Sequence, residues 1–187
     1  FFDEFFKRMT YLGDGLVYLI LFVILLFYSY RWTLLYVSSV AISNLMVCIG
    51  KQLIFQEAYR PSKYFEIYEN YKLYLVSDVK LHSLHSFPSG HATTVFTIFM
   101  ILALLVRNKI LKFACFIVAF LSGYSRIYLS QHFLIDVVVG SAIGAISILI
   151  MWQFFNHFQQ KWLNESLGSI FSKSRKKDGP FWVPDNF

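Results

Sequence analysis

The chain has 187 residues, of which 57% are apolar, 20% aromatic and only 15% charged. Soluble domains carry roughly 25% charged residues, so this composition excludes an ordinary soluble domain, a disordered chain and a coiled coil. The 17 Lys and Arg residues exceed the 11 Asp and Glu residues, giving a net charge of +6. Because the basic residues are distributed unevenly between the ends of apolar runs, we interpret this charge as a membrane-orientation signal and expect no nucleic-acid partner.

The first segment, residues 1–11, alternates pairs of phenylalanines with charged residues. This pattern is typical of an amphipathic segment that lies in the membrane interface. The sequence has no starting Met, which leaves room for a further N-terminal span before Phe1. We expect no signal peptide, because no small-residue cleavage site follows a short apolar core.

Five apolar runs follow, each bounded by charged or turn residues. A spanning helix needs about 20 mostly apolar residues, and four of the runs reach that length. The third run has roughly 16 residues, or about 24 Å of helix, so we expect it to begin below the headgroup level. The sequence predicts one all-α domain over 1–187, a polytopic membrane bundle of about five transmembrane helices, at residues 12–30, 32–55, 91–106, 110–129 and 132–155.

Two polar regions flank these spans, a loop at 62–86 and a basic tail at 156–187. Five spans place residues 1–14, 51–89 and 125–136 on one side of the membrane. The opposite side carries nine Lys and Arg residues, and this side carries eight. Three of those eight belong to the polar clusters described next. The positive-inside rule then predicts a cytoplasmic tail and an outward-facing loop in a multi-pass inner membrane protein.

Three polar clusters share the side that we predict to face outward. Charged side chains within a membrane are costly, roughly 2.5–3.5 kcal/mol at a helix centre, so their retention favours a functional role. The number of spans between the clusters places all three on the same side of the membrane although they are distant in sequence, as an assembled active site requires. The clusters are Lys51 with Arg60, then Ser89, Gly90 and His91, then Arg126, His132 and Asp136.

The spacing of His132 and Asp136 puts both side chains on one helix face. The carboxylate could fix one imidazole nitrogen and leave the other nitrogen free to attack an electrophile. A structural pair in the core is the alternative interpretation of this motif. Gly140 and Gly144 continue the four-residue spacing, which predicts close packing against a neighbouring helix.

Residues 88–91 read Pro-Ser-Gly-His and place a turn just before a helix. Free backbone N–H groups and the helix dipole favour an anion there, and His91 could protonate a leaving oxygen. An ordinary capped helix start has the same pattern. Lys51, Arg60 and Arg126 could hold a phosphate, although basic residues at an interface also extend toward lipid headgroups.

Other polar residues give weaker signals. His82 and His85 lack a Cys or carboxylate at a suitable spacing, so we expect no metal site. Asp14 precedes an apolar run and is expected to cap its helix. His157 falls on the opposite side of the membrane from the clusters.

The combination of motifs is more specific than its parts. Lys51 to Arg60-Pro61, PSGH at 88–91 and SRIYLSQHFLID at 125–136 together resemble the three-part signature of the type 2 phosphatidic acid phosphatase (PAP2) superfamily, in its membrane lipid phosphate phosphatase branch. The resemblance extends from about Lys51 to Gly144, half the chain. It implies a metal-free phosphatase without cofactors, in which His132 attacks phosphorus, Asp136 orients it and His91 protonates the leaving alkoxide. The phosphoryl oxygens would be held by Lys51, Arg60, Ser89, Gly90 and Arg126.

We therefore expect an enzyme that hydrolyses a phosphomonoester or pyrophosphate of a lipid at the outer face of the membrane, through a phosphohistidine. Its partners would be the lipid phosphate substrate and the surrounding membrane lipids. A lipid phosphotransferase would use the same intermediate, and a membrane scaffold without catalysis is the non-enzymatic alternative.

The first motif departs from the family pattern. Eight residues separate Lys51 from Arg60, whereas the usual number is six. On a continuous helix an offset of nine residues places the two side chains on opposite faces. The helix must therefore end between them, near Gln56, for both to reach one phosphate. Pro61 favours this arrangement because the residue before a proline avoids the helical conformation.

Overall fold

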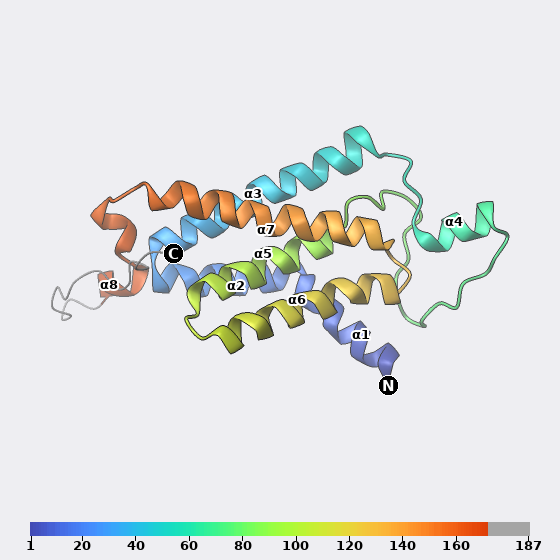
Figure 1. The fold of residues 1–187 in the computed structure, drawn as a ribbon, viewed down its shortest axis with the longest axis horizontal. Helices are drawn as coiled ribbons and strands as arrows, with labels where there is room; N and C mark the ends of the chain where they lie inside the picture. The colour runs from blue at the N-terminus through green and yellow to red at the C-terminus, as the bar shows by residue number, and fades with distance from the viewer. Residues whose placement is uncertain (172–187) are drawn as a thin grey trace.

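The computed structural model describes residues 1–171, so the second half of the predicted basic tail, residues 172–187, lies outside the described residues. Throughout the described range the regular structure is helical, with no strands. Among the described residues, five helices form the bundle and three are shorter. The shorter helices lie at the ends of the bundle (Figure 1). The bundle helices are α2 (Gly15–Tyr28), α3 (Tyr30–Ile49), α5 (Gly90–Leu105), α6 (Lys109–Tyr128) and α7 (Leu134–Asn156), and the shorter ones are α1 (Phe2–Thr10), α4 (Pro61–Tyr68) and α8 (Leu167–Phe171).

The five predicted apolar runs all form helices, which confirms the all-α membrane bundle. Three are long and apolar enough to cross a membrane: α6, α7, and α3 with the π-helical turn η2 (Gly50–Ile54) that continues it. A fourth candidate is the pair formed by Phe2–Gly13 and α2, which is bent by 50°. The predicted short third run is α5, with 16 residues.

The predicted interfacial segment is the helix α1, which packs against α6. Phe6 is buried there between the rings of Tyr124 and Tyr128, with centroids 5.5 and 4.4 Å away. The Tyr128 hydroxyl donates to Asp3 at 2.7 Å. A short 3-10 turn, η1 (Tyr11–Gly13), then leads into α2. This contact places the first turn of the chain beside the end of α6.

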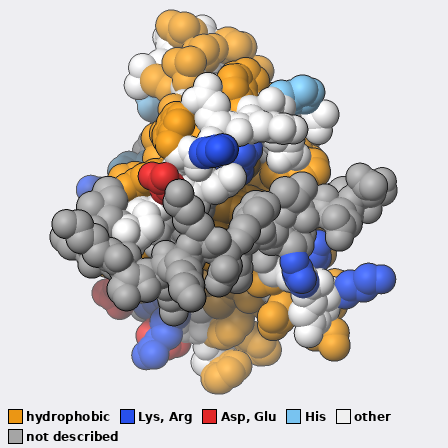
Figure 2. Space-filling view, turned by 90° about the vertical axis from the view of Figure 1, so that its left-hand side faces the viewer, with side chains coloured by type: hydrophobic (Ala, Val, Ile, Leu, Met, Phe, Trp, Pro, Cys, Tyr) orange, Lys and Arg blue, Asp and Glu red, His pale blue; other side chains and the backbone are white. Residues whose placement is uncertain are grey.

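The two sets of connections lie at opposite ends of the bundle. In Figure 1, α1 and α4 mark one end, and α8 marks the other. Figure 2 looks onto the α8 end and shows Lys and Arg side chains among hydrophobic ones. The helix sides carry exposed apolar residues, such as Phe113, Phe116 and Phe120 on α6. A bilayer solvates such faces well, which agrees with a multi-pass membrane protein.

Helices α5 and α7 approach closely because two glycines of α7 have no side chain at the contact. A β-carbon built on Gly140 would collide with the carbonyl oxygen of Ser89, and one built on Gly144 would collide with that of Thr93. The Thr93 hydroxyl donates across the same contact to the Gly140 carbonyl at 3.0 Å. The close helix packing predicted from Gly140 and Gly144 is therefore confirmed. This packing holds the start of α5 against α7.

We predict that Gly144→Ala destabilises the bundle by about 1–3 kcal/mol, the usual range for forcing an extra methyl group into a packed contact. The obstacle is backbone of α5, which cannot rotate away. Thermal unfolding in detergent measures the effect. Gly15→Ala is the matched control, because nothing lies within 4 Å of a β-carbon at Gly15. Equal melting temperatures for the two variants would contradict this account.

Candidate active site

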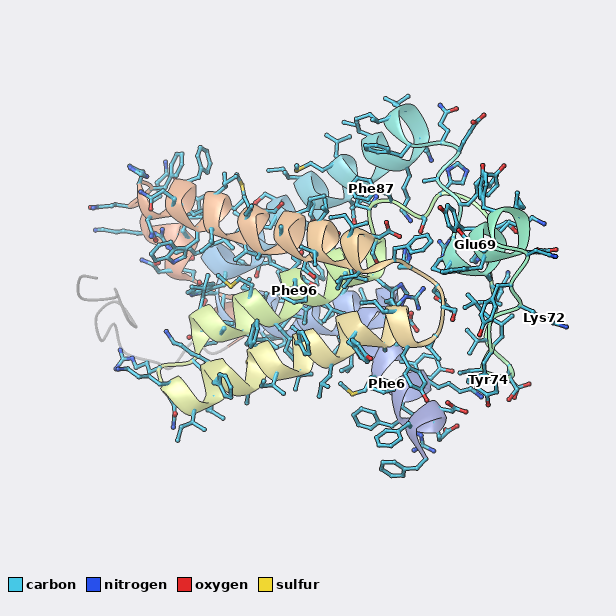
Figure 3. All side chains as sticks on the ribbon, turned by 45° about the vertical axis from the view of Figure 1, so that its right-hand side comes forward. Phe6, Glu69, Lys72, Tyr74, Phe87 and Phe96 are labelled. Carbon is cyan, nitrogen blue, oxygen red and sulfur yellow. The ribbon has the colours of Figure 1, made fainter. Side chains whose placement is uncertain are left out.

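The structure brings the three polar clusters to the end of the bundle where α4 lies. Phe87, labelled in Figure 3, marks the chain just before α5 and lies at this end. Each cluster comes from residues at or next to a helix terminus. The contributions are Lys51 in η2, Arg60 before α4, Ser89, Gly90 and His91 at the start of α5, Arg126 near the end of α6, and His132 and Asp136 at the start of α7.

His132 and Asp136 form a buried pair. The imidazole Nδ1 lies 3.4 Å from Asp136 Oδ2, and each residue is only 2% exposed. The same carboxylate oxygen accepts the Ser86 hydroxyl proton and the backbone N–H of Phe133, the latter at 3.0 Å. Three donors therefore hold the carboxylate in one place. Ser86 was not identified from the sequence, since its turn carries no periodic signal.

The environment of His132 favours its neutral form. Burial lowers the pKa of this imidazole to about 4. Asp136 opposes the shift, whereas the positive charges of Arg60, Arg126 and Lys51 reinforce it. A neutral ring that donates from Nδ1 to the carboxylate has its lone pair on Nε2. This is the form that a nucleophilic imidazole requires at neutral pH.

Arg60 is fixed by backbone carbonyls. It has an extended backbone before Pro61, and its buried guanidinium donates to the carbonyls of Leu84 and Gln131 at 3.2 and 3.3 Å. The preceding helix ends at Ile54, which confirms that the helix stops between Lys51 and Arg60.

Lys51 sits in the π-helical turn that ends this helix. It lies within electrostatic range of Arg60, Arg126 and Asp136. Its backbone carbonyl is 3.1 Å from Nδ1 of His85, a residue outside the predicted clusters. The break in the helix thus brings both cations of the first motif toward one site.

Arg126 has an unmet hydrogen-bonding capacity. Its side chain is buried, and one terminal N–H group donates to the Thr10 hydroxyl at 2.7 Å. Its Nε is buried without a hydrogen-bond partner among the described residues. A buried donor that lacks a partner is costly, and a guanidinium suits the paired oxygens of a phosphate. This Nε N–H group is therefore able to donate to an anionic oxygen.

The start of α5 is both a capped helix and a potential anion site. The Ser89 oxygen accepts from the backbone N–H of Ala92 at 3.4 Å, so the capping interpretation holds. The backbone N–H of Ser89 donates to the Asp136 carbonyl at 3.0 Å and ties α5 to α7. As the acceptor in the cap, Ser89 keeps its hydroxyl proton for another partner, and Gly90 begins the helix where N–H groups point outward.

His91 has a partner that the sequence did not reveal. Its Nε2 lies 2.9 Å from Asp14 Oδ1. Asp14 occupies the cap position of α2, but its side chain makes no capping hydrogen bond, so the expectation of a side-chain helix cap is wrong. The carboxylate turns instead toward α5. The only available signal was that Asp14 falls on the same predicted side as the three clusters.

The weaker candidates differ in their relation to this site. The His85 ring contacts the Lys51 carbonyl, and His82 lies within electrostatic range of the three site cations. Among residues 1–171, no group of three or more His, Cys, Asp or Glu side chains is placed to share a metal ion. His157 lies at the opposite end of the bundle, where its ring contacts the Gln153 carbonyl. His82 lines a partly open cavity of about 580 Å³ formed by α4 and the loop after it, with Lys63 and Tyr71 also in its wall.

This arrangement is similar to that of known membrane proteins. The family described as PAP2 superfamily matches residues 32–160. Over 78 residues the chain is 31% identical to a lipid A 4'-phosphatase of Porphyromonas gingivalis, a match that covers 42% of this chain and 33% of that protein. The chain thus spans about a third of the length of this curated relative.

Two solved structures share the fold. The crystal structure of Aquifex aeolicus LpxE matches with a TM-score of 0.66 and 30% identity, over 81% of this chain and 86% of that one. A transmembrane PAP2-type phosphatidylglycerolphosphate phosphatase from Bacillus subtilis matches with a TM-score of 0.67 and 25% identity, over 86% of this chain and 79% of that one. Both matches extend over most of the bundle and are not confined to a local motif.

We predict that Ser86→Ala destabilises the protein by about 1–3 kcal/mol, because it removes one of three donors from a buried carboxylate. Thermal unfolding in detergent provides the measurement. Ser83→Ala is the matched control, since Ser83 is exposed and the structure uses its backbone carbonyl, which the change retains. A Ser86→Ala variant as stable as the control would show that the Asp136 carboxylate does not depend on this hydroxyl.

Proposed function

Because the chain belongs to the PAP2 superfamily, we propose that it is a membrane lipid phosphatase that works through a phosphohistidine intermediate. The observation that carries this proposal is the buried His132–Asp136 pair beside the vacant Nε of Arg126. His132, the proposed nucleophile, lies within electrostatic range of Arg126, whose Nε N–H group is the proposed hydrogen-bond donor to the phosphate. The similarity to two lipid phosphatases supports the same reaction class.

In the proposed mechanism, the phosphoryl oxygens bind to cations and backbone N–H groups. The His132 Nε2 lone pair attacks phosphorus, and the bond between phosphorus and the ester oxygen breaks. His91 gives a proton to the departing alkoxide, which leaves as the alcohol. Water then attacks the phosphohistidine, loses a proton to the now neutral His91, and releases inorganic phosphate and free His132. Negative charge on the transferring group is stabilised by Lys51, Arg60, Arg126, Ser89 and the Gly90 backbone.

The substrate in this proposal is a lipid phosphomonoester or pyrophosphate that shares the membrane with the enzyme. The site lies at the end of helices whose sides are apolar, so a lipid could reach it by lateral diffusion. The curated relative acts on lipid A, and the Bacillus subtilis relative is named for phosphatidylglycerolphosphate. Transfer to an acceptor other than water, the phosphotransferase alternative, would consume the same intermediate.

We predict that His132→Ala lowers phosphate release from lipid phosphates by at least a thousandfold, because the covalent path is lost. Asp136→Asn should lose less, since the attacking nitrogen remains. The measurement is phosphate release by purified protein on a panel of lipid phosphates. His157→Ala, at the opposite end, is the matched control. Activity of His132→Ala within tenfold of the control would refute the assignment of His132 as the nucleophile. Release of a phosphorylated alcohol acceptor would instead identify a phosphotransferase.

The proposed mechanism uses no metal. The proposed phosphate-binding groups are cations and backbone N–H groups. The Asp136 carboxylate already accepts from His132, Ser86 and Phe133, and the Asp14 carboxylate contacts His91. We predict that phosphate release survives exhaustive EDTA treatment and is inhibited by vanadate, which adopts the geometry of the transferring phosphoryl group. Loss of activity with EDTA that Mg²⁺ or Zn²⁺ restores would contradict the prediction.

The proposed orientation places the active site on the outer side and the C-terminal tail in the cytoplasm. We predict that a cysteine at Ser83, but not one at Gln159, reacts with an impermeant thiol reagent applied to intact cells. Both positions are exposed and lie toward opposite ends of the bundle. The background carries Ala in place of Cys48 and Cys115, the free cysteines. The reverse labelling pattern would invert the topology.

A further inference from the structure

We propose that Asp14 is a positioning residue that holds His91 in the orientation needed to protonate the leaving group. The inference rests on the proposed function, because it assigns His91 the role of general acid. It adds a second His–Asp pair to the site, built from a segment that lies outside the three motifs. The resemblance to the family begins at Lys51, so Asp14 lies well before it in the sequence.

A direct polar contact joins Asp14 to His91. Asp14 Oδ1 is 2.9 Å from His91 Nε2. Asp14 is itself held by the backbone, because its N–H donates to the Tyr11 carbonyl at 3.1 Å and its own carbonyl accepts from Val17 at 3.0 Å. Its side chain makes no capping hydrogen bond to α2, the local role that an aspartate in this position usually has. The carboxylate is thus committed to the imidazole of α5.

The residues just before Asp14 also contact His91. Gly13 packs against the His91 ring, and a β-carbon at Gly13 would lie 2.6 Å from His91 Cδ2. The backbone of Thr10 also interacts with the same imidazole. The Thr10 hydroxyl accepts from Arg126 at 2.7 Å. Residues 10–14 therefore contact both His91, the proposed general acid, and Arg126, a proposed phosphate-binding residue.

The chemistry of a His–Asp pair explains what this contact does. When Asp14 accepts from Nε2–H, the Nδ1–H of the imidazolium is the proton that remains for transfer. As the ester bond to phosphorus breaks, the alkoxide takes the Nδ1 proton, and the neutral ring keeps its Nε2–H on Asp14. Burial and the positive charge of Arg126 both disfavour the imidazolium, and the Asp14 carboxylate opposes them. The two pairs then have opposite tasks, since His132 is used neutral and His91 is used protonated.

The test compares two substrates that differ in their need for an acid. A long-chain alkyl phosphate has a poor leaving group, whereas p-nitrophenyl phosphate has one that departs without protonation. We expect Asp14→Asn to lower kcat on the alkyl phosphate by about 10- to 100-fold, within the range of general acid catalysis, and on the aryl phosphate by less than about threefold. Asp78→Asn, an exposed aspartate at the same end that pairs only with Lys7, is the matched control.

The His91→Ala variant separates failure of this inference from failure of the proposed function. Selective loss on the alkyl phosphate in both His91→Ala and Asp14→Asn supports the inference. Selective loss in His91→Ala alone overturns the inference and leaves the proposed function intact. Equal losses on both substrates in Asp14→Asn, with or without a lower melting temperature, would show a structural role and also overturn it. No selective loss in His91→Ala would remove the general acid and overturn the inference, whereas the proposed function is tested separately by His132→Ala.

Discussion

The site depends on the close approach of α5 to α7. The two glycines of α7 let the α5 backbone come near enough for the Ser89 N–H to bond the carbonyl of Asp136. That single bond ties the first turn of α5, with its outward-pointing N–H groups, to the residue that fixes His132. The proposed anion site and the proposed nucleophile, which come from separate motifs, are thereby held in a fixed relative position. A wider spacing between these helices would separate the two, even if each remained folded.

Electrostatics explains why this end of an apolar bundle tolerates so much charge. Three cations lie within electrostatic range of one another, and the buried carboxylate near them is already occupied by three donors. The balance is an excess of positive charge that a phosphate dianion would neutralise. Burial meanwhile keeps His132 uncharged, so it can act as a nucleophile. Asp14 provides a further carboxylate, at the His91 imidazole.

The sequence predicted those features that follow from hydrophobic runs and helical spacing. Runs of apolar residues located the five bundle helices, and the nine-residue offset from Lys51 to Arg60 required the helix end that the structure shows after Ile54. Ser86 and Asp14 were missed because each meets its partner across a large sequence separation, from a turn without periodicity. The short helix α4 was also missed, since a two-turn segment within a polar loop has no long apolar face.

The central claim is that His132 carries the phosphoryl group, and trapping that species tests it most directly. Wild-type protein is mixed with a ³²P-labelled lipid phosphate and quenched in alkali within milliseconds, and the labelled peptide is identified by mass spectrometry. The account predicts a label that is stable in alkali, labile in acid and located on His132, and that is absent from His132→Ala. A label on any other residue, or turnover without a labelled enzyme at any quench time, would contradict it.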